Sequence, residues 1–327
     1  MIISQTPLRL SLLGGNTDFS KFFNKYGGCV LSTAINKYVY CIVTKRFDNK
    51  IYVNWSKKEI VDRVNQIEHE LVREALRKVR IDRGIEITFL SDIPAEGSGL
   101  GSSSAVTVGV LNALYHLSNV NPSAEKLARE AVDIEVNILK KPIGIQDQYA
   151  CAFGGLRFYK FSRTKVTSAI LGINDGLLED LDNSLMLFYT GRTRKSGAIL
   201  TGLNGSLKDK AKIKLNLKTK KLAQSGYRAV ATGRIDKLGE LLGQAWGIKK
   251  QMAAGITDPE IDAMYARAVN AGAIGGKIAG AGGGGFMMLV VPWENRVAVR
   301  KALKKYREVP FRLEPEGSKI IFNYRNN

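Results

Sequence analysis

Histidine and cysteine are scarce in this sequence of 327 residues. The two histidines, His69 and His116, are too few to favour histidine catalysis. Both are expected to be structural, because His69 lies in a highly charged segment and His116 near the end of an expected helix. The three cysteines, Cys29, Cys41 and Cys151, are far apart and odd in number. We interpret them as small buried thiols rather than as disulfides or metal ligands.

Long apolar runs are also missing. No segment approaches the roughly 18 apolar residues of a membrane span, and the best apolar run, 286–292, has the length of a strand. The first residues lack the basic start, apolar stretch and cleavage site of a signal peptide. These absences predict a cytoplasmic protein without a membrane partner.

Acidic residues are few in relation to basic ones. The sequence has 30 Asp and Glu against 49 Lys and Arg, a formal net charge of +19. Such a charge suits an anionic partner, either nucleic acid or a small phosphorylated substrate. The basic segment 192–250 has few aromatic residues on which bases could stack, which argues against nucleic acid. A phosphorylated substrate explains only part of the excess charge.

Length and hydrophobic patterning predict an α+β fold of two domains. The chain is too long for one ordinary core, and its elements lack the strict alternation of a doubly wound sheet. We place the domains at 1–180 and 181–327. Expected strands cover residues 2–4, 8–13, 39–44, 85–90, 184–189, 286–292 and 319–324. Expected helices cover residues 57–80, 103–117, 121–140, two segments of 207–254 separated near 233, 259–271 and 294–306.

Glycine and serine crowd into residues 97–104, which read G-S-G-L-G-S-S-S. Glycine lets the backbone approach a ligand closely, and the helix that follows adds the positive end of its dipole. Free backbone N–H groups aimed at one point suit a phosphate. The segment therefore predicts a phosphate site, most simply for a nucleotide.

The common nucleotide motifs are missing. The sequence contains neither a P-loop nor the protein-kinase catalytic set. Residues 280–285 match G-x-G-x-x-G, but they follow an expected helix and open a strand. A dinucleotide fingerprint has the opposite order, so we reject that interpretation.

Three glycine motifs remain, at residues 14–18, 97–104 and 280–285. In their order and flanks they resemble the three motifs of the GHMP kinases, a family that includes galactokinase, homoserine kinase and mevalonate kinase. The resemblance covers essentially the whole chain. It implies an ATP-dependent phosphotransferase that acts on an alcohol group. It also implies an ATP-binding first domain like ribosomal protein S5 domain 2 and a ferredoxin-like second domain.

Three further stretches narrow the resemblance to bacterial kinases of D-glycero-D-manno-heptose 7-phosphate and related sugar kinases. They are T-P-L-R-L-S-L-L-G-G-N-T-D-F from Thr6, G-I-Q-D-Q-Y-A-C-A-F-G-G from Gly144 and F-Y-T-G-R-T-R from Phe188. The implied reaction phosphorylates the anomeric hydroxyl of that heptose phosphate, for nucleotide-activated heptose synthesis. Those relatives usually carry a third glycine where this chain has Asn16. Asparagine tolerates a left-handed backbone, so the turn can be kept.

The resemblance assigns catalytic roles to Asp147 and Arg9. Asp147 matches the family's catalytic aspartate, which would accept the proton of the sugar hydroxyl or orient that hydroxyl. Arg9 matches the neighbouring basic residue, which would keep the aspartate ionised and offset charge on the moving phosphoryl group. The alternatives are a helix-capping aspartate and a surface arginine at a strand end.

Glu135 and Ser103 match the family's Mg²⁺ ligands, and Ser102 or Ser104 could take the place of Ser103. Magnesium prefers oxygen ligands and keeps several waters. The alternative is an exposed helical glutamate. The phosphates of ATP are expected to meet the backbone of Gly97, Ser98, Gly99, Leu100, Gly101, Ser102, Ser103 and Ser104.

The expected substrate contacts come from both ends of the chain. A carboxylate such as Asp18 can accept two vicinal hydroxyls, although it could also only stabilise a turn. Arg194 and its neighbours could hold an anionic group such as a 7-phosphate. The full set is Gly15, Thr17, Asp18, Thr193, Arg194, Gly282, Gly283 and Gly284.

Two other functions stay open. The first is the same chemistry on another sugar, such as fucose or galactose. The second is a catalytically inactive relative that binds nucleic acid or a protein through its basic surface. The sequence also leaves a homo-oligomer open.

Overall fold

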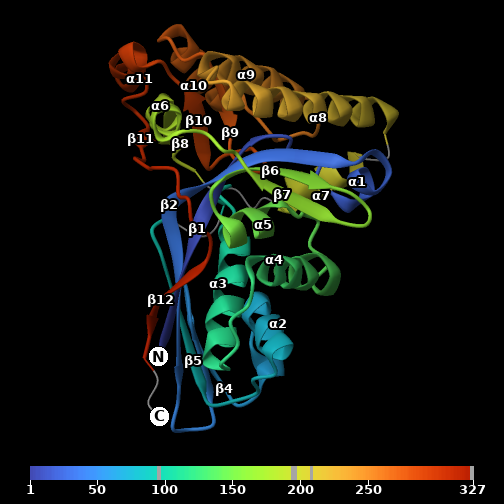
Figure 1. Ribbon diagram of the computed structural model, residues 1–327, viewed down its shortest axis with the longest axis vertical. Helices are drawn as coiled ribbons and strands as arrows, with labels where there is room; N and C mark the ends of the chain where they lie inside the picture. The colour runs from blue at the N-terminus through green and yellow to red at the C-terminus, as the bar shows by residue number, and fades with distance from the viewer. Residues whose placement is uncertain (94–96, 193–196, 207–208, 325–327) are drawn as a thin grey trace.

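Two sheets organise the chain (Figure 1). The computed structural model describes residues 1–93, 97–192, 197–206 and 209–324. Within these ranges the first sheet has eight strands, β1 (Ile2–Leu13), β2 (Gly28–Lys45), β3 (Ile51–Asn54), β4 (Lys58–Val61), β5 (Ile85–Ser91), β6 (Leu156–Phe161), β7 (Val166–Ile170) and β12 (Lys319–Asn323). Their order is β12-β1-β2-β5-β3-β4, with β6 paired to β2 and β7 to β6. The second sheet, as far as it is described, has the order β11 (Arg307–Glu308), β8 (Leu185–Tyr189), β10 (Phe286–Val290), β9 (Gly275–Ile278).

Helices cover both sheets. The helices that precede β6 in the chain are α1 (Ser20–Tyr26), α2 (Glu70–Val79), α3 (Ser102–Leu117), α4 (Ala124–Val132) and α5 (Gln146–Phe153). The later helices are α6 (Asp175–Ser184), α7 (Gly197–Ser206), α8 (Lys210–Ala231), α9 (Ile235–Lys250), α10 (Pro259–Asn270) and α11 (Arg296–Ala302). A π-helical turn, Asp133–Ile138, extends α4, and short 3₁₀ turns cover Val64–Gln66 and Trp293–Asn295. The predicted α+β class is confirmed. None of the helices in the described ranges is long and apolar enough to cross a bilayer.

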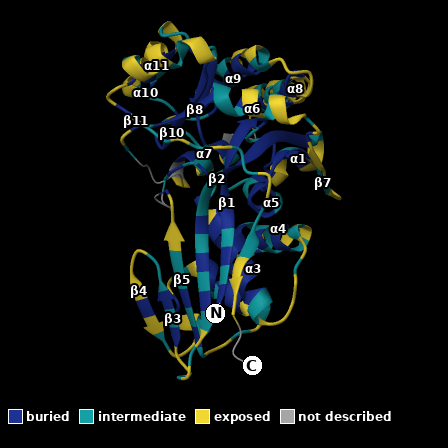
Figure 2. Ribbon diagram, turned by 60° about the vertical axis from the view of Figure 1, so that its left-hand side comes forward, coloured by how far each residue is buried: buried dark blue, intermediate teal, exposed yellow. Residues whose placement is uncertain are grey.

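Helix α3 is buried on nearly all sides. It packs against β1 and β2 on one side and against α2, α4 and α5 on the other (Figures 1 and 2). A helix that is apolar all round needs such an enclosed position, and most residues of α3 are accordingly buried. The serine-rich start of α3 is thereby held rigidly at the junction of the two sheets.

One hydrophobic core joins the two sheets. Residues of β1 and β2 belong to the same buried cluster as residues of α8, α9 and β10. At Gly226 of α8, an added Cβ would lie 2.3 Å from a methyl carbon of Leu13. Such close packing allows side chains from both sheets to form one site.

Three expectations on local structure need correction. Residues 57–80 are not one helix but strand β4, a 3₁₀ turn and α2. The Glu59 carboxylate accepts hydrogen bonds from the backbone N–H groups of Glu68 and His69. These contacts hold the segment before α2 outside the helix. The helix expected from residue 121 begins only at Ala124, after Ser123, whose hydroxyl accepts the N–H of Lys126. The two expected first strands are one strand, with a register shift after Pro7.

The last strand returns to the first sheet. β12 pairs antiparallel with β1, from Ile2 opposite Asn323 to Gln5 opposite Lys319. The first sheet therefore contains strands from both ends of the chain. The proposed domain boundary at residue 180 falls within α6 and stays a prediction.

Candidate active site

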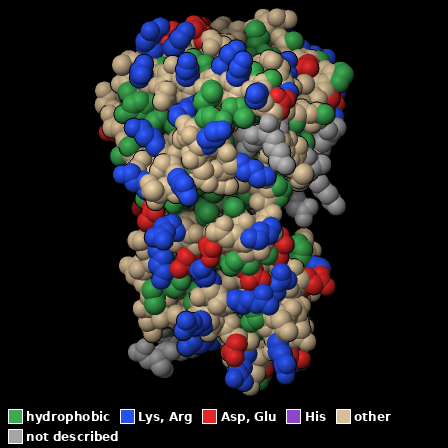
Figure 3. Space-filling view, turned by 90° about the vertical axis from the view of Figure 1, so that its right-hand side faces the viewer, with side chains coloured by type: hydrophobic (Ala, Val, Ile, Leu, Met, Phe, Trp, Pro, Cys, Tyr) green, Lys and Arg blue, Asp and Glu red, His purple; other side chains and the backbone are tan. Residues whose placement is uncertain are grey.

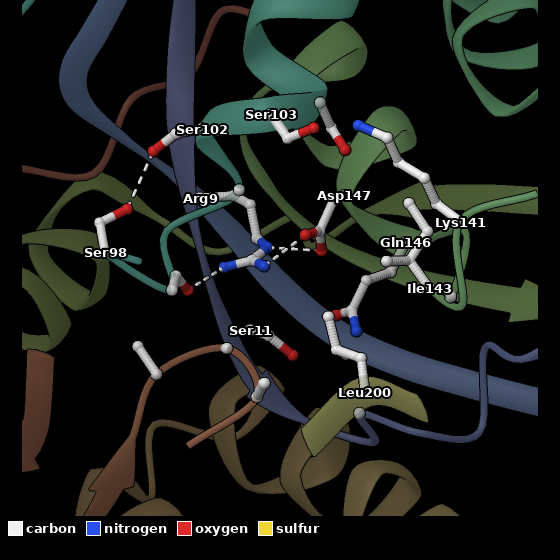
Figure 4. A pocket seen from close by; sticks show the side chains of 18 of the residues that line it. Arg9, Ser11, Ser98, Ser102, Ser103, Lys141, Ile143, Gln146, Asp147 and Leu200 are labelled. Carbon is white, nitrogen blue, oxygen red and sulfur yellow. Dashed lines mark hydrogen bonds and ion pairs between the residues drawn. The ribbon is translucent and has the colours of Figure 1, made fainter. Parts of the chain in front are cut away.

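The three glycine motifs meet around one cavity of about 960 Å³. Its walls come from β1, the start of α3, the start of α5, helix α9 and the loop after β9 (Figure 4). The cavity brings together many of the predicted site residues, namely Arg9, Gly15, Asp18, Gly97, Ser98, Gly99, Gly101, Ser102, Ser103, Ser104, Asp147, Gly282 and Gly284. Four others do not line it, namely Thr17, Leu100, Glu135 and Gly283. Thr193 and Arg194 lie outside the described residues.

Arg9 and Asp147 form a bidentate ion pair at the centre of the cavity (Figure 4). The Arg9 Nε and Nη2 atoms donate to the two carboxylate oxygens at 2.6 and 2.5 Å. Nη1 donates to the backbone oxygen of Gly99 at 2.7 Å, so the same guanidinium also fixes the glycine loop. Burial opposes the charge of Arg9, but the Asp147 carboxylate outweighs this and raises the pKa of Arg9. Such a fork holds the carboxylate in one orientation.

The first turn of α3 faces the cavity without a side-chain cap. The residue before it, Gly101, has a left-handed backbone with φ of 80° and offers no side-chain acceptor. N–H groups of a first helical turn need acceptors from outside the helix. This arrangement suits an anion at Ser102, Ser103 and Ser104. Leu100 serves the loop differently, since it is buried and its carbonyl accepts the N–H of Arg9 at 2.9 Å.

The glycines let two loops touch through their backbones. A Cβ added to Gly99 would lie 2.6 Å from the carbonyl oxygen of Ala279, and one added to Gly280 would lie 2.5 Å from the Cα of Gly99. Both residues also have positive φ, 74° and 63°. The loop after β9 therefore supports the loop before α3 directly. Gly283 belongs to that support, because its N–H donates to the carbonyl of Ile256 at 2.7 Å.

Asp18 lines the cavity and has one carboxylate oxygen that is buried without a partner among the described residues. Its side chain is buried, and its Oδ2 accepts the backbone N–H of Gln146 at 3.2 Å. Oδ1 has no hydrogen-bond partner among the described residues. Burial, with the charge of Asp147 second, raises the pKa of Asp18 to about 6. Thr17, in contrast, uses its hydroxyl within the turn, where it donates to the Gly14 and Cys29 carbonyls at 2.7 and 2.9 Å.

Glu135 lies behind Ser103, fully buried and just outside the cavity. Its carboxylate accepts the hydroxyls of Ser103 at 2.7 Å, Ser104 at 2.8 Å and Thr107 at 3.2 Å. The amide of Gln148 is a fourth donor. Glu135 and Ser103 are thus side by side, and their oxygens suit Mg²⁺. These donors surround the carboxylate, so a metal would have to replace at least one of these hydrogen bonds.

Part of the cavity wall is aromatic. Trp55 meets the edge of His69 at 4.8 Å between ring centroids, and His69 stacks on Phe89 at 5.8 Å. Trp55 donates its indole N–H to Glu59 at 2.9 Å, which fixes the ring. The predicted structural role of His69 agrees with its position as N-cap of α2.

Sequence reasoning missed several polar residues of the cavity, and four of them bear on ligand binding. The Ser11 hydroxyl and the side-chain oxygen of Gln146 are buried without a partner among the described residues. Ser11 is two residues from Arg9 on the same strand, so it shares the face of β1, and Gln146 precedes Asp147. Figure 4 shows both on the side of Arg9 away from Ser103. The other two, Lys249 and Lys277, have no local signal beyond Lys277 preceding the last glycine motif.

The Arg192 side chain does not line the cavity but pairs with Asp258. Its Nη2 donates to both carboxylate oxygens of Asp258 at 2.7 and 2.6 Å, and its carbonyl accepts the N–H of Gly285. Asp258 also caps α10 through the N–H groups of Glu260 and Ile261. Arg192 therefore ties α10 to the glycine loop after β9.

Known proteins resemble this chain over nearly its whole length. Residues 69–155 match the family model of the GHMP kinases N terminal domain, and residues 227–309 match that of the GHMP kinases C terminal. The chain is 32% identical over 320 residues to the D-glycero-alpha-D-manno-heptose 7-phosphate kinase of Campylobacter jejuni, covering 93% of each.

Two further similarities bear on the substrate. A crystal structure of a D-glycero-D-manno-heptose 1-phosphate kinase from Bacteroides thetaiotaomicron matches with a TM-score of 0.81 at 28% identity, over 99% of this chain and 100% of that one. The L-fucokinase/L-fucose-1-P guanylyltransferase of Bacteroides fragilis is 29% identical over 222 residues. That match covers 66% of this chain and 23% of the larger relative.

Proposed function

The chain belongs to the GHMP kinase family, and on that premise we propose that it phosphorylates the anomeric hydroxyl of D-glycero-D-manno-heptose 7-phosphate, for nucleotide-activated heptose synthesis. The predicted family, its two-part fold and a phosphotransferase acting on a sugar hydroxyl are thereby confirmed. The observation that carries the proposal is the Arg9–Asp147 pair, which shares one cavity with the serine-rich start of α3 and with Asp18 (Figure 4). Because the reaction consumes ATP, we place it in the cytoplasm.

The acceptor hydroxyl of the sugar binds to the Asp147 carboxylate. Its side chain is 25% exposed although its partner Arg9 is almost fully buried, so a hydroxyl can approach the carboxylate from the cavity. The carboxylate orients the hydroxyl and accepts its proton as the phosphoryl group is transferred. Arg9 keeps that carboxylate in place and puts a positive charge beside the transferred group.

The phosphate chain of ATP lies against the uncapped start of α3 and the loop from Gly97 to Gly101. Backbone N–H groups there supply donors whose positions are fixed by the contact between Gly99 and Ala279. Ser103 and Glu135 would hold Mg²⁺ together with phosphate oxygens and waters, with the metal replacing the hydrogen bond between the two side chains. When bound, the metal neutralises charge on the phosphates.

The sugar lies on the other side of Arg9. Asp18, Ser11 and Gln146 have buried oxygens without partners there, which sugar hydroxyls can satisfy. Buried polar groups are normally paired, so three orphans in one cavity indicate a polyhydroxylated ligand.

An ADP-release assay tests the proposal. Purified protein, ATP and Mg²⁺ would be incubated with D-glycero-D-manno-heptose 7-phosphate, with the dephosphorylated heptose, and with fucose and galactose. We expect the largest kcat/KM with the heptose 7-phosphate, and a phosphorus resonance of an anomeric phosphate in the product. A neutral sugar as the best acceptor would refute the substrate.

Fucose is the acceptor that the similarity to the fucokinase of Bacteroides fragilis favours as second candidate. The other rival, an inactive nucleic-acid binder, would show no turnover and a steeply salt-dependent affinity for DNA or RNA. Figure 3 shows Lys and Arg spread over the whole of one face, with acidic side chains among them mainly in its lower half. That distribution supports a small-molecule kinase.

A further inference from the structure

We propose that Lys249 and Lys277 form a phosphate-binding subsite on the wall that α9 and β9 contribute to the cavity, a role that rests on the kinase function proposed above. Neither lysine belongs to the three glycine motifs, and neither takes part in the steps assigned to Arg9 and Asp147. The phosphate can come from the sugar phosphate or from ATP, and the experiment below separates the two sources.

Lys277 is a buried lysine whose amino group has no partner among the described residues. It lies on β9 opposite Met288, and the residue is only 6% exposed. Its ammonium forms no hydrogen bond or ion pair with any residue that the structure describes, yet it lines the cavity. Burying an unpaired charge is costly, and a methionine would fill the position without that cost. A stabilising role in the fold therefore does not explain this lysine.

Lys249 fixes the geometry of the same wall. From the last turn of α9, its Nζ donates to the carbonyls of Ile278 and Gly280 at 3.0 and 2.5 Å. An ammonium has three protons, so one is left for a ligand. Both carbonyls belong to the segment that follows Lys277, and Gly280 touches Gly99 of the phosphate loop. The two lysines are thus held next to the loop expected to bind phosphate.

The basic side chains at this wall, Lys249, Lys277 and Arg9, favour the binding of an anion. Burial lowers the pKa of Lys277 well below its usual value, with Lys249 and Arg9 as further causes. Burial and Arg9 likewise lower the pKa of Lys249 to about 7. The carboxylates of Asp18, Glu68, Glu70 and Asp147 also line the cavity, but among the described residues neither lysine forms an ion pair with any of them. A phosphate supplies up to two negative charges and several acceptor oxygens.

The placement of the wall favours the phosphate of the acceptor. Figure 4 shows the loop after β9 on the same side of Arg9 as Ser11, where the sugar is expected. A sugar whose hydroxyl meets Asp147 could extend its phosphate toward this wall.

Calorimetric binding with matched variants tests the subsite. The variants are Lys277→Met and Lys249→Met, and the control is Lys250→Met, an exposed neighbour that pairs with Asp262 at 3.2 Å. The probes are heptose 7-phosphate, inorganic phosphate, the ATP analogue AMP-PNP, and AMP. Thermal unfolding of each variant reports whether the fold is kept, and the two lysine variants are independent of each other in this respect.

Loss of one or two charge-assisted hydrogen bonds should weaken binding about 10- to 100-fold. We expect that loss for heptose 7-phosphate and inorganic phosphate, with AMP-PNP unchanged and the control like the wild type. A loss for AMP-PNP but not AMP would keep the subsite and identify ATP as its source. Affinities within about twofold of wild type for all probes, or equal losses for AMP-PNP and AMP, would overturn the subsite. Because these are binding measurements, failure to turn over heptose 7-phosphate would refute the substrate alone, and inorganic phosphate would still report on the lysines.

Discussion

Replacing Asp18 by asparagine should make the protein more stable and at the same time a poorer kinase. The carboxylate is almost fully buried, and one of its oxygens has no partner among the described residues. Its pKa rises from 3.8 to about 6, through burial first and the charge of Asp147 second. The folded protein therefore binds this proton more tightly than the unfolded chain.

The sign and size of the effect follow from that difference. Below pH 3.8 the carboxyl is protonated in both states and costs nothing, and stability is lost as the pH rises through about 6. A shift of about two units corresponds to about 3 kcal/mol of unfolding free energy. Asparagine keeps an oxygen for the N–H of Gln146 but carries no charge. Asp18→Asn should thus be more stable than wild type by up to about 3 kcal/mol at pH 8, and by about half of that at pH 5.

Urea unfolding followed by circular dichroism at pH 5 and pH 8 measures this difference. The matched control is Asp82→Asn, whose wild-type side chain is 79% exposed and should change stability by less than about 0.5 kcal/mol. The same variant should raise KM for the sugar about tenfold or more, because a hydroxyl loses a charged acceptor. A variant no more stable than wild type at pH 8, or equally stabilised at both pH values, would refute the reasoning.

Three other substitutions have expected outcomes. Asp147→Asn should lower kcat by about 10²- to 10⁴-fold while AMP-PNP still binds in calorimetry, and unchanged turnover would remove Asp147 from the mechanism. Gly99→Ala should weaken ATP binding and lower the melting temperature, because its Cβ would lie 2.6 Å from a backbone oxygen. The control Gly247→Ala, with nothing within 4 Å, should raise stability by about 0.5–1 kcal/mol. Glu135→Gln should raise the Mg²⁺ concentration needed for half-maximal activity about tenfold, whereas lower activity with an unchanged Mg²⁺ dependence would indicate a purely structural residue.

The starts of helices were predictable where the neighbouring residues in the sequence determine them. The start of α3 was expected at Ser103 and lies at Ser102, because the glycines before it need positive φ and the apolar helix follows at once. α10 begins at Pro259 behind the capping Asp258, as the Asp-Pro pair indicates. Segment 57–80 failed because its apolar spacing fits a helix, whereas contacts with Glu59 and the pairing of β4 with β3 decide its structure.

The features of the site also fall into those that the sequence indicates and those that only the tertiary structure shows. The sequence by itself determined the family and predicted a phosphate-binding loop at residues 97–104 together with site roles for Arg9, Asp18 and Asp147. These motifs are contiguous, and the close backbone contacts at Gly99 and Gly280 require glycine. Only the tertiary structure decided that Arg9 clamps a carboxylate 138 residues away and that Thr17 is used within its turn. It alone also placed Lys277 in the cavity, because the burial of a lone lysine depends on segments far away in the chain.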